Sequence, residues 1–236
     1  MPRRARLRIA GLPLHVVQRG NNKKPCFFTD ADRVLYLGLL KELLGRNHCQ
    51  LHAYVFMTNH VHLLLTPERE ESVSGLMKNL GQRYVQRINR TYSRSGSLWE
   101  GRFRSSIVDS DHYLFRCYRY VELNPVRAGM VRHPLEYEWS SHRANAAGES
   151  SPIITRHAHF DALGDSDAAR RSAYATLFER SLTEAELKQI RDSTNAGLAL
   201  GSEAFLDRIT QRLGRRAGPG IPGRRPKEDA LAAWFS

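Results

Sequence analysis

Hydrophobic and polar positions switch between strand-like and helix-like spacing along the chain. Residues 12–22 (LPLHVVQRGNN) predict a strand followed by a polar turn, and residues 29–47 carry apolar positions at helical spacing. Residues 49–57 and 60–67 are two β-type runs separated only by Thr-Asn, which predicts a hairpin. A strand, a helix and a hairpin are therefore expected in this order.

The same alternation continues as far as residue 124. Residues 72–96 predict a long helix, residues 102–109 a short strand, and residues 110–124 a helix that must end before Pro125. The order β-α-β-β-α-β-α indicates an α+β fold, a ferredoxin-like antiparallel sheet with helices packed on one face. We expect this domain to span residues 1–145.

A small, polar segment, residues 146–160, follows the domain and predicts a linker. Residues 161–214 predict a helical extension, in which Thr183 and Glu186 match a capping box. Two interpretations of this extension are open: a helix-turn-helix-like module that binds duplex or hairpin DNA, or a helical cap. Residues 215–236 make a basic tail rich in Gly, Pro and Arg.

The charge of the chain points to a polyanionic partner. The sequence has 36 Lys and Arg against 24 Asp and Glu, a net charge of +12, and a pI of about 10.0. Cys26, Cys49 and Cys117 contain no CxxC pair, which is typical of a reducing compartment. The sequence shows no signal-like or membrane-length apolar run, so we expect a cytoplasmic, nucleoid-associated protein with no membrane partner.

The two histidines of TNHVHLLL (residues 58–65) are the first candidates for chemistry. His60 and His62 are two apart on a predicted strand, so their side chains share one face and can bind a divalent metal. A single pair of this kind is more often two core or surface histidines whose hydrogen bonds are satisfied. As metal ligands, two histidines alone would also leave the ion incompletely coordinated. The helix near residue 120 offers further groups, because Tyr120 and Asn124 are four apart and share a helix face.

Three motifs together resemble a known family. YVFMTNHVHLLLTP, WEGRFRSS and YVELNPVRAGMV stand in the order and at separations similar to those of the single-tyrosine HUH transposases of the insertion sequence 200-like superfamily. The details are most similar to the REP-associated tyrosine transposases, the RAYT group. The resemblance covers about residues 8–145.

This resemblance implies the chemistry of the site. His60 and His62 match the metal-binding histidines, and Asn124 stands where insertion-sequence enzymes commonly have a Gln ligand. Tyr120 matches the nucleophilic tyrosine. With Mg²⁺ or Mn²⁺ as cofactor, the implied reaction is cleavage of single-stranded DNA through a 5′-phosphotyrosine adduct, followed by rejoining to a 3′-hydroxyl. The implied partner is single-stranded and hairpin-forming, REP-like DNA, bound by a monomer or a homodimer.

Basic side chains predict the surface that the DNA contacts. Four arginines between residues 83 and 94 fall at i, i+4, i+7 and i+11, which is one face of the expected helix. Trp99 stands among arginines, as suits stacking on unpaired bases, although core packing is an equal alternative. The predicted DNA-binding residues are Arg3, Arg4, Arg83, Arg87, Arg90, Arg94, Trp99, Arg102, Arg104, Arg127, Arg215, Arg216, Arg224 and Arg225.

Other functions remain open at this point. Tyr118 and Tyr113 are rival nucleophiles on the helix of Tyr120. The same fold without chemistry would be a domesticated DNA- or RNA-binding regulator, but such a binder has no need of both histidines and the tyrosine. A replication initiator or a relaxase commonly has a different tyrosine context or an attached helicase. The activity of a metal-dependent hydrolase, which uses the histidines to activate water, would survive the loss of Tyr120.

Overall fold

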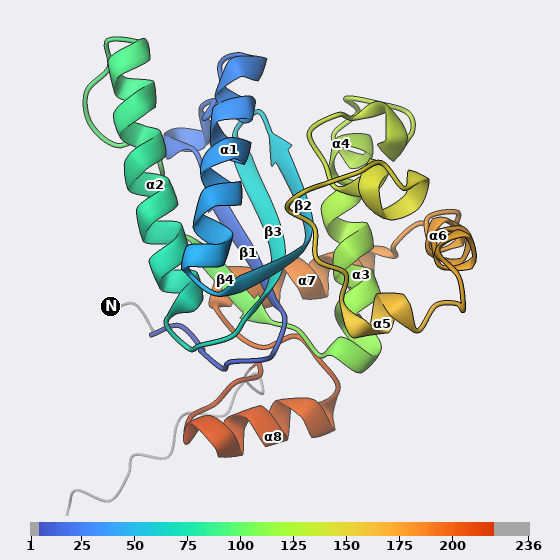
Figure 1. The fold of residues 1–236 in the computed structure, drawn as a ribbon. Coiled ribbons are helices and arrows are strands. Elements are labelled where there is room, and N and C mark those ends of the chain that lie inside the picture. Colours follow the sequence, from blue (N-terminus) through green and yellow to red (C-terminus); the bar gives the residue numbers. More distant parts are fainter. Residues whose placement is uncertain (1–4, 220–236) are drawn as a thin grey trace, which may run out of the picture.

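The computed structural model describes residues 5–219. Within this range lies a four-stranded antiparallel sheet in the order β2-β3-β1-β4 (Figure 1). The strands are β1 (Leu14–Arg19), β2 (Cys49–Met57), β3 (His60–Pro67) and β4 (Arg104–Ile107). The predicted hairpin is present as β2 and β3, and β1 pairs with the other edge of β3. The strand that carries the two histidines is therefore an inner strand.

The helices lie close to their predicted positions. They are α1 (Asp30–Arg46), α2 (Ser72–Thr91), α3 (Ser110–Glu122), α4 (Asn124–Arg127), α5 (Ala158–Asp161), α6 (Asp167–Thr176), α7 (Glu184–Ala196) and α8 (Glu203–Leu213). Short 3-10 turns span Asn21–Lys23 and Pro134–Glu136, and a π-helical turn spans Arg143–Ala147. The Thr183–Glu186 capping box begins α7, and Gly214, with a φ of 60°, ends α8. No helix within residues 5–219 is long and apolar enough to cross a membrane.

One face of the sheet is covered by α1 and α2 (Figure 1). Val61, Leu63 and Leu65 of β3 point into this layer and are fully buried. Tyr36 of α1 and Tyr84 of α2 meet there edge to face, with ring centroids 5.0 Å apart. This aromatic and leucine-rich layer forms the larger part of the core.

The other face is covered as well, which corrects the expectation of helices on one face only. Helix α3, to the right of the strands in Figure 1, packs on β2 and β3, and α7, behind them, packs on β4 and β1. Leu64 belongs to this second layer, together with Leu114 of α3 and Ile190 of α7. The reason is visible in β3, where the run of leucines gives both faces buried side chains, as in a strand covered on both sides.

A buried polar cluster holds α3 against the segment that follows it. The Glu122 carboxyl group is fully buried and accepts hydrogen bonds from Ser141 Oγ at 2.6 Å and Asn145 Nδ2 at 2.8 Å. It also binds His142 Nδ1 at 2.7 Å, and Tyr174 of α6 donates its hydroxyl at 2.8 Å. These contacts tie α3, the π-helical turn and α6 into one unit.

The predicted linker, residues 146–160, is packed against the edge of the sheet. Ile154 forms a parallel bridge with Leu51 of β2, and the Thr155 amide donates to the Leu51 carbonyl at 2.7 Å. Ile153 is buried in the core. The segment therefore connects the two parts of the chain along a fixed path.

Candidate active site

His60 and His62 lie side by side on the face of β3 that α3 and α7 cover. Their ring centroids are 4.9 Å apart, at an interplanar angle of 80°. His62 is buried and His60 half-buried. Burial, with smaller contributions from Arg19 and Arg127, lowers the pKa of His60 to about 4. Burial also lowers the pKa of His62 well below its usual value, so both rings are neutral at ordinary pH.

Tyr120 of α3 lies over this pair. Its ring centroid is 5.7 Å from that of His62, at an interplanar angle of 79°. The Arg127 guanidinium stacks on the Tyr120 ring at 4.6 Å and donates to the Tyr120 carbonyl. Burial raises the pKa of Tyr120, and Arg127 and Arg191 oppose that rise. The predicted partnership of this tyrosine with the histidines is thus present in space.

The two rival tyrosines of α3 point elsewhere. Tyr118 is fully buried on the outer side of α3, where its ring packs at 5.6 Å from Tyr174. Burial raises its pKa far above the ordinary value. Tyr113 lies near the start of α3 with Arg116 stacked on its ring at 4.7 Å. Of the three, Tyr120 is the one whose ring contacts the histidines.

Two residues that the sequence did not single out complete the site. His15 of β1 stacks on His62, with the ring centroids 5.0 Å apart, and its Nε2 is hydrogen-bonded to His62 Nδ1 at 2.8 Å. Its Nδ1 is hydrogen-bonded at 3.0 Å to Oγ1 of Thr194, a residue of α7. Burial lowers the pKa of His15 to about 3. A buried histidine in the strand LPLHVVQ was the available signal for His15, whereas Thr194 and the nearby Arg191 carry no local signal.

Asn124 lies one turn beyond Tyr120, at the junction of two helices. Helix α3 ends at Glu122, and Asn124 is the first residue of α4. Its side chain is half-buried, and its backbone carbonyl accepts from Ala128. Within residues 5–219, no cluster of three His, Cys, Asp or Glu side chains is arranged to hold a metal. A metal held by His60 and His62 would therefore need a third ligand of another kind, such as the predicted amide of Asn124.

The predicted arginine row on α2 lies on the opposite side of the sheet from Tyr120 (Figure 1). Arg83 is paired with Glu42 of α1 at 2.7 Å, so the row is not free of acidic partners. Arg87 and Arg90 are exposed on α2. Arg94 lies past the end of the helix, which corrects the expected continuous face, and stacks over Phe28 at 5.1 Å.

Trp99 is part of the core. It is 6% exposed, and its ring lies 6.0 Å from Tyr84 and 6.4 Å from Tyr36. Of the two alternatives for this tryptophan, core packing is the one that the structure supports. Trp99 therefore contributes to the packing of the core.

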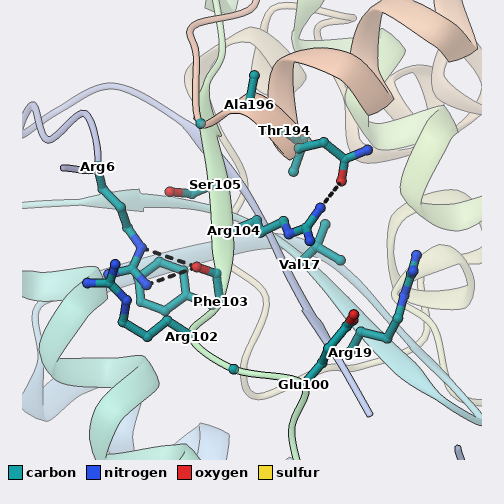
Figure 2. A pocket seen from close by; sticks show the side chains of 13 residues that line it. Arg6, Val17, Arg19, Glu100, Arg102, Phe103, Arg104, Ser105, Thr194 and Ala196 are labelled. Atoms are coloured by element: carbon teal, nitrogen blue, oxygen red, sulfur yellow. Dashed lines mark hydrogen bonds between the residues drawn. The ribbon is translucent and has the colours of Figure 1, made fainter. Parts of the chain in front are cut away.

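A cationic pocket lies beside the histidines, on the same face of the sheet. It has a volume of about 360 Å³ and opens between β1, the segment 100–105 and the end of α7. Figure 2 shows Arg6 and Arg102 on one side, and Arg19 and Glu100 at the other. Arg104 donates a hydrogen bond to Asn195 Oδ1 at 2.7 Å. Four arginines thus face one acid here.

The pocket borders the site directly. Thr194 lines it, and Val17 in its wall pairs with His62 in the sheet register. The carbonyl of Phe103 accepts from the Arg6 guanidinium at 2.9 and 3.2 Å, which holds that side chain in place. Burial lowers the pKa of Arg6 to about 10, with Arg102 and Arg8 contributing.

The remaining predicted DNA-binding residues are at the two ends of the chain. Arg215 donates to the backbone carbonyls of Ala5 and Arg6, so it joins the C-terminal segment to the N-terminal one. Arg216 is exposed and donates to the carbonyl of Pro219. Four further positions lie outside the described residues: Arg3, Arg4, Arg224 and Arg225.

Comparison with known proteins decides the family. Residues 9–124 match the family model described as Transposase IS200 like. This segment of the chain belongs to that family. The matched segment contains both histidines and Tyr120, and it ends at Asn124. No protein of curated function matches the sequence.

Solved structures show where the fold of this transposase has a counterpart. A REP-associated tyrosine transposase, solved bound to a REP hairpin, aligns with a TM-score of 0.55 and 15% identity. The alignment covers 66% of this chain and 93% of the other, which confirms the predicted α+β fold. A putative transposase from Deinococcus radiodurans R1 aligns over 50% of this chain and 95% of its own, with 18% identity. Its TM-score of 0.35 is too low to establish a shared fold.

Proposed function

We propose that this IS200-like transposase is a metal-dependent endonuclease and strand transferase that acts on single-stranded, hairpin-forming DNA through Tyr120. One observation carries the proposal: the Tyr120 ring lies against His62, next to two neutral imidazoles on one strand face. The hairpin as substrate class is taken from the similar transposase that was solved with a REP hairpin. The cationic pocket beside the site supports a nucleic-acid substrate.

The histidine pair fits a divalent metal. Both imidazoles are neutral, which is the form that binds metals, and the Nδ1 of each is already hydrogen-bonded. Within residues 5–219, no hydrogen bond uses the Nε2 of either ring. When bound by His60, His62 and the Asn124 amide, the ion would polarise the scissile phosphate. Two nitrogen ligands favour Mn²⁺ over Mg²⁺, which prefers oxygen.

Tyr120 supplies the nucleophile. Its phenolic oxygen forms the new bond to phosphorus as the bond to the 3′ oxygen breaks, which leaves a 5′-phosphotyrosine and a 3′-hydroxyl that takes up a proton. Attack by another 3′-hydroxyl reverses the step, returns the proton to Tyr120 and joins the strands. Because burial raises the pKa of Tyr120, the guanidiniums of Arg127 and Arg191 have the task of stabilising the phenolate.

The arginines of the pocket hold the DNA strand. Arg19, Arg102 and Arg104 line a groove that borders the histidines through Thr194, so a strand whose phosphates follow it leads toward Tyr120. The exposed arginines of α2 lie on the far face and would contact DNA that wraps around the sheet. Single-strand binding at the pocket therefore does not depend on them.

The test uses the full chain, Mn²⁺ and a labelled hairpin oligonucleotide whose sequence is taken from repeats that flank the gene. Wild type should form a covalent protein–DNA band on a denaturing gel, and Tyr120→Phe and His60→Ala should not. Tyr118→Phe is the matched control, because the Tyr118 ring is fully buried against Tyr174, away from the histidines. It should keep the adduct.

The other outcomes separate the competing functions. Cleavage that persists in Tyr120→Phe would mean that water attacks and the chain is a hydrolase. An adduct lost in Tyr118→Phe but kept in Tyr120→Phe would show that Tyr118, and not Tyr120, is the nucleophile. Tight binding with no cleavage under any metal would refute the transferase and favour a regulator of the same fold.

A further inference from the structure

We infer that His15 and Thr194 hold His62 in one tautomer, with a proton on Nδ1 and a free lone pair on Nε2, ready to bind the metal. The inference rests on the proposed function of His62 as a metal ligand. It assigns positioning roles to a residue of β1 and to a residue of α7. Helix α7 lies outside the segment that matches the transposase family.

The direction of the hydrogen bonds follows from the end of the chain of contacts. Thr194 Oγ1 donates its single proton to the Ile190 carbonyl at 2.9 Å, so toward other groups it acts as an acceptor. His15 Nδ1, at 3.0 Å from that oxygen, must then carry a proton. Ser106 Oγ, 3.1 Å from the same hydroxyl oxygen, can donate to its second lone pair.

The state of His62 follows from that of His15. A neutral imidazole with its proton on Nδ1 presents a lone pair at Nε2. His15 Nε2 therefore accepts, and His62 Nδ1, 2.8 Å away, donates. Both rings are buried and neither has a carboxylate partner within residues 5–219, which favours neutral rings. Nε2 of His62 is left unprotonated.

A shorter contact gives His60 the same tautomer. Asn59 Nδ2 donates to the Lys23 carbonyl at 3.0 Å, which can only accept, and this fixes the orientation of the amide. Asn59 Oδ1 is then the atom 2.6 Å from His60 Nδ1, so His60 Nδ1 donates. Both histidines therefore present Nε2 as a lone pair, through two independent anchors on different parts of the fold.

Such outer contacts matter for metal affinity. A metal-binding histidine usually donates its second ring nitrogen to a protein group, and loss of that group typically weakens metal binding about 10–100-fold. In this chain the partner of His62 is a second histidine, anchored in turn by a hydroxyl of the C-terminal segment. The C-terminal helices therefore take part in the metal site as well as in packing.

The experiment reads the tautomer directly, in metal-free protein. Long-range ¹H–¹⁵N correlation spectra of ¹⁵N-labelled full chain should show His62 with its proton on Nδ1, assigned by loss of the signals in His62→Gln. Thr194→Val keeps the shape and removes the hydroxyl, so Nε2-protonated His62 should appear. Thr194→Ser should restore the wild-type tautomer. Mn²⁺ affinity, measured by calorimetry, should fall about 10–100-fold in Thr194→Val and recover in Thr194→Ser.

Thr66→Val is the matched control. Thr66 Oγ1 is hydrogen-bonded at 2.8 Å to Nε2 of His52, another buried histidine of the same sheet, on β2. This change should leave the His62 tautomer and the Mn²⁺ affinity as in wild type. A general loss of packing would act in both Thr→Val variants alike.

Failure of this inference differs from failure of the proposed function. A His62 protonated on Nε2 in wild type, or a tautomer and affinity unchanged in Thr194→Val, would overturn the positioning role and leave the metal site standing. A tautomer that responds as expected in a protein that binds no Mn²⁺ would support the positioning contacts and overturn the metal-dependent function.

Discussion

The buried Glu122 carboxyl group should contribute more to stability than any exposed acid of this protein. Its four hydrogen bonds, from Ser141, His142, Asn145 and Tyr174, fill the four acceptor positions of a carboxylate. The Glu122→Ala substitution would leave the His142 and Tyr174 donors in a buried pocket without an acceptor. Ser141 Oγ would keep the Tyr54 carbonyl at 3.3 Å, and Asn145 Nδ2 the His52 carbonyl at 3.1 Å.

The size of the effect can be worked from these contacts. Each buried donor that loses its acceptor costs about 1–3 kcal/mol, which for these two donors gives roughly 2–6 kcal/mol if nothing relaxes. Water entry and side-chain rotation reduce the sum, and breaking a buried polar pair typically costs about 3–5 kcal/mol. We expect a loss within that range for Glu122→Ala. A domain of this kind is stable by only about 5–15 kcal/mol.

Urea unfolding followed by circular dichroism measures the loss. Glu122→Gln should fall between wild type and Glu122→Ala, because one amide oxygen still accepts from Ser141 and Asn145. Glu42→Ala is the control, since Glu42 forms its ion pairs with Arg83 and Arg46 at the surface, where solvent screens them, and should change little. A loss below about 1 kcal/mol in Glu122→Ala would refute the reasoning.

Three further outcomes can be checked. Burial lowers the pKa of His52 to about 4, so the unfolded chain gains a proton below pH 6.5 that the folded chain does not. The free energy of unfolding should therefore fall between pH 7 and pH 5. The fall should be about 2 kcal/mol smaller in His52→Gln than in wild type, as measured by urea unfolding at both pH values. Gly20→Ala would place a methyl group against the Lys24 carbonyl oxygen and should cost about 1–3 kcal/mol, whereas Gly38→Ala, in open space on α1, should stabilise by about 1 kcal/mol; thermal unfolding compares them. Arg102→Ala should lower the slope of log affinity against log salt for a single-stranded hairpin by about 0.7, and an unchanged slope would remove Arg102 from the DNA path.

Local pattern predicted the elements of this fold well, because each has a period that a short window can detect. The hairpin 49–67 and the start of α3 at Ser110 are where the spacing places them. The layer arrangement was predicted only in part. A run such as Leu63–Leu65 shows that both faces are buried but does not say which helix covers the second face.

The residues of the candidate site also fall into those that local pattern predicts and those that it does not. His60, His62 and Tyr120 belong to two short motifs, so the sequence alone brought them together. His15 and Thr194 are 179 positions apart and hydrogen-bond through a sheet and a helix that no local spacing connects. Arg191 reaches the surroundings of Tyr120 in the same way. Residues of this kind become visible only once the second face of the sheet is known.

That second face explains why the chain after residue 145 matters to the site. Helix α3 brings Tyr120 onto the face and α7 brings Thr194, and both helices share one apolar layer with Leu64 of β3. Leu200, which follows α7, bridges to Val108 beside β4, so the layer closes from the C-terminal side. Without this segment, His15 Nδ1 would lose its hydroxyl partner, Thr194 Oγ1. The structure therefore favours a functional unit that runs from β1 through α7, with the residues after 145 as part of its core.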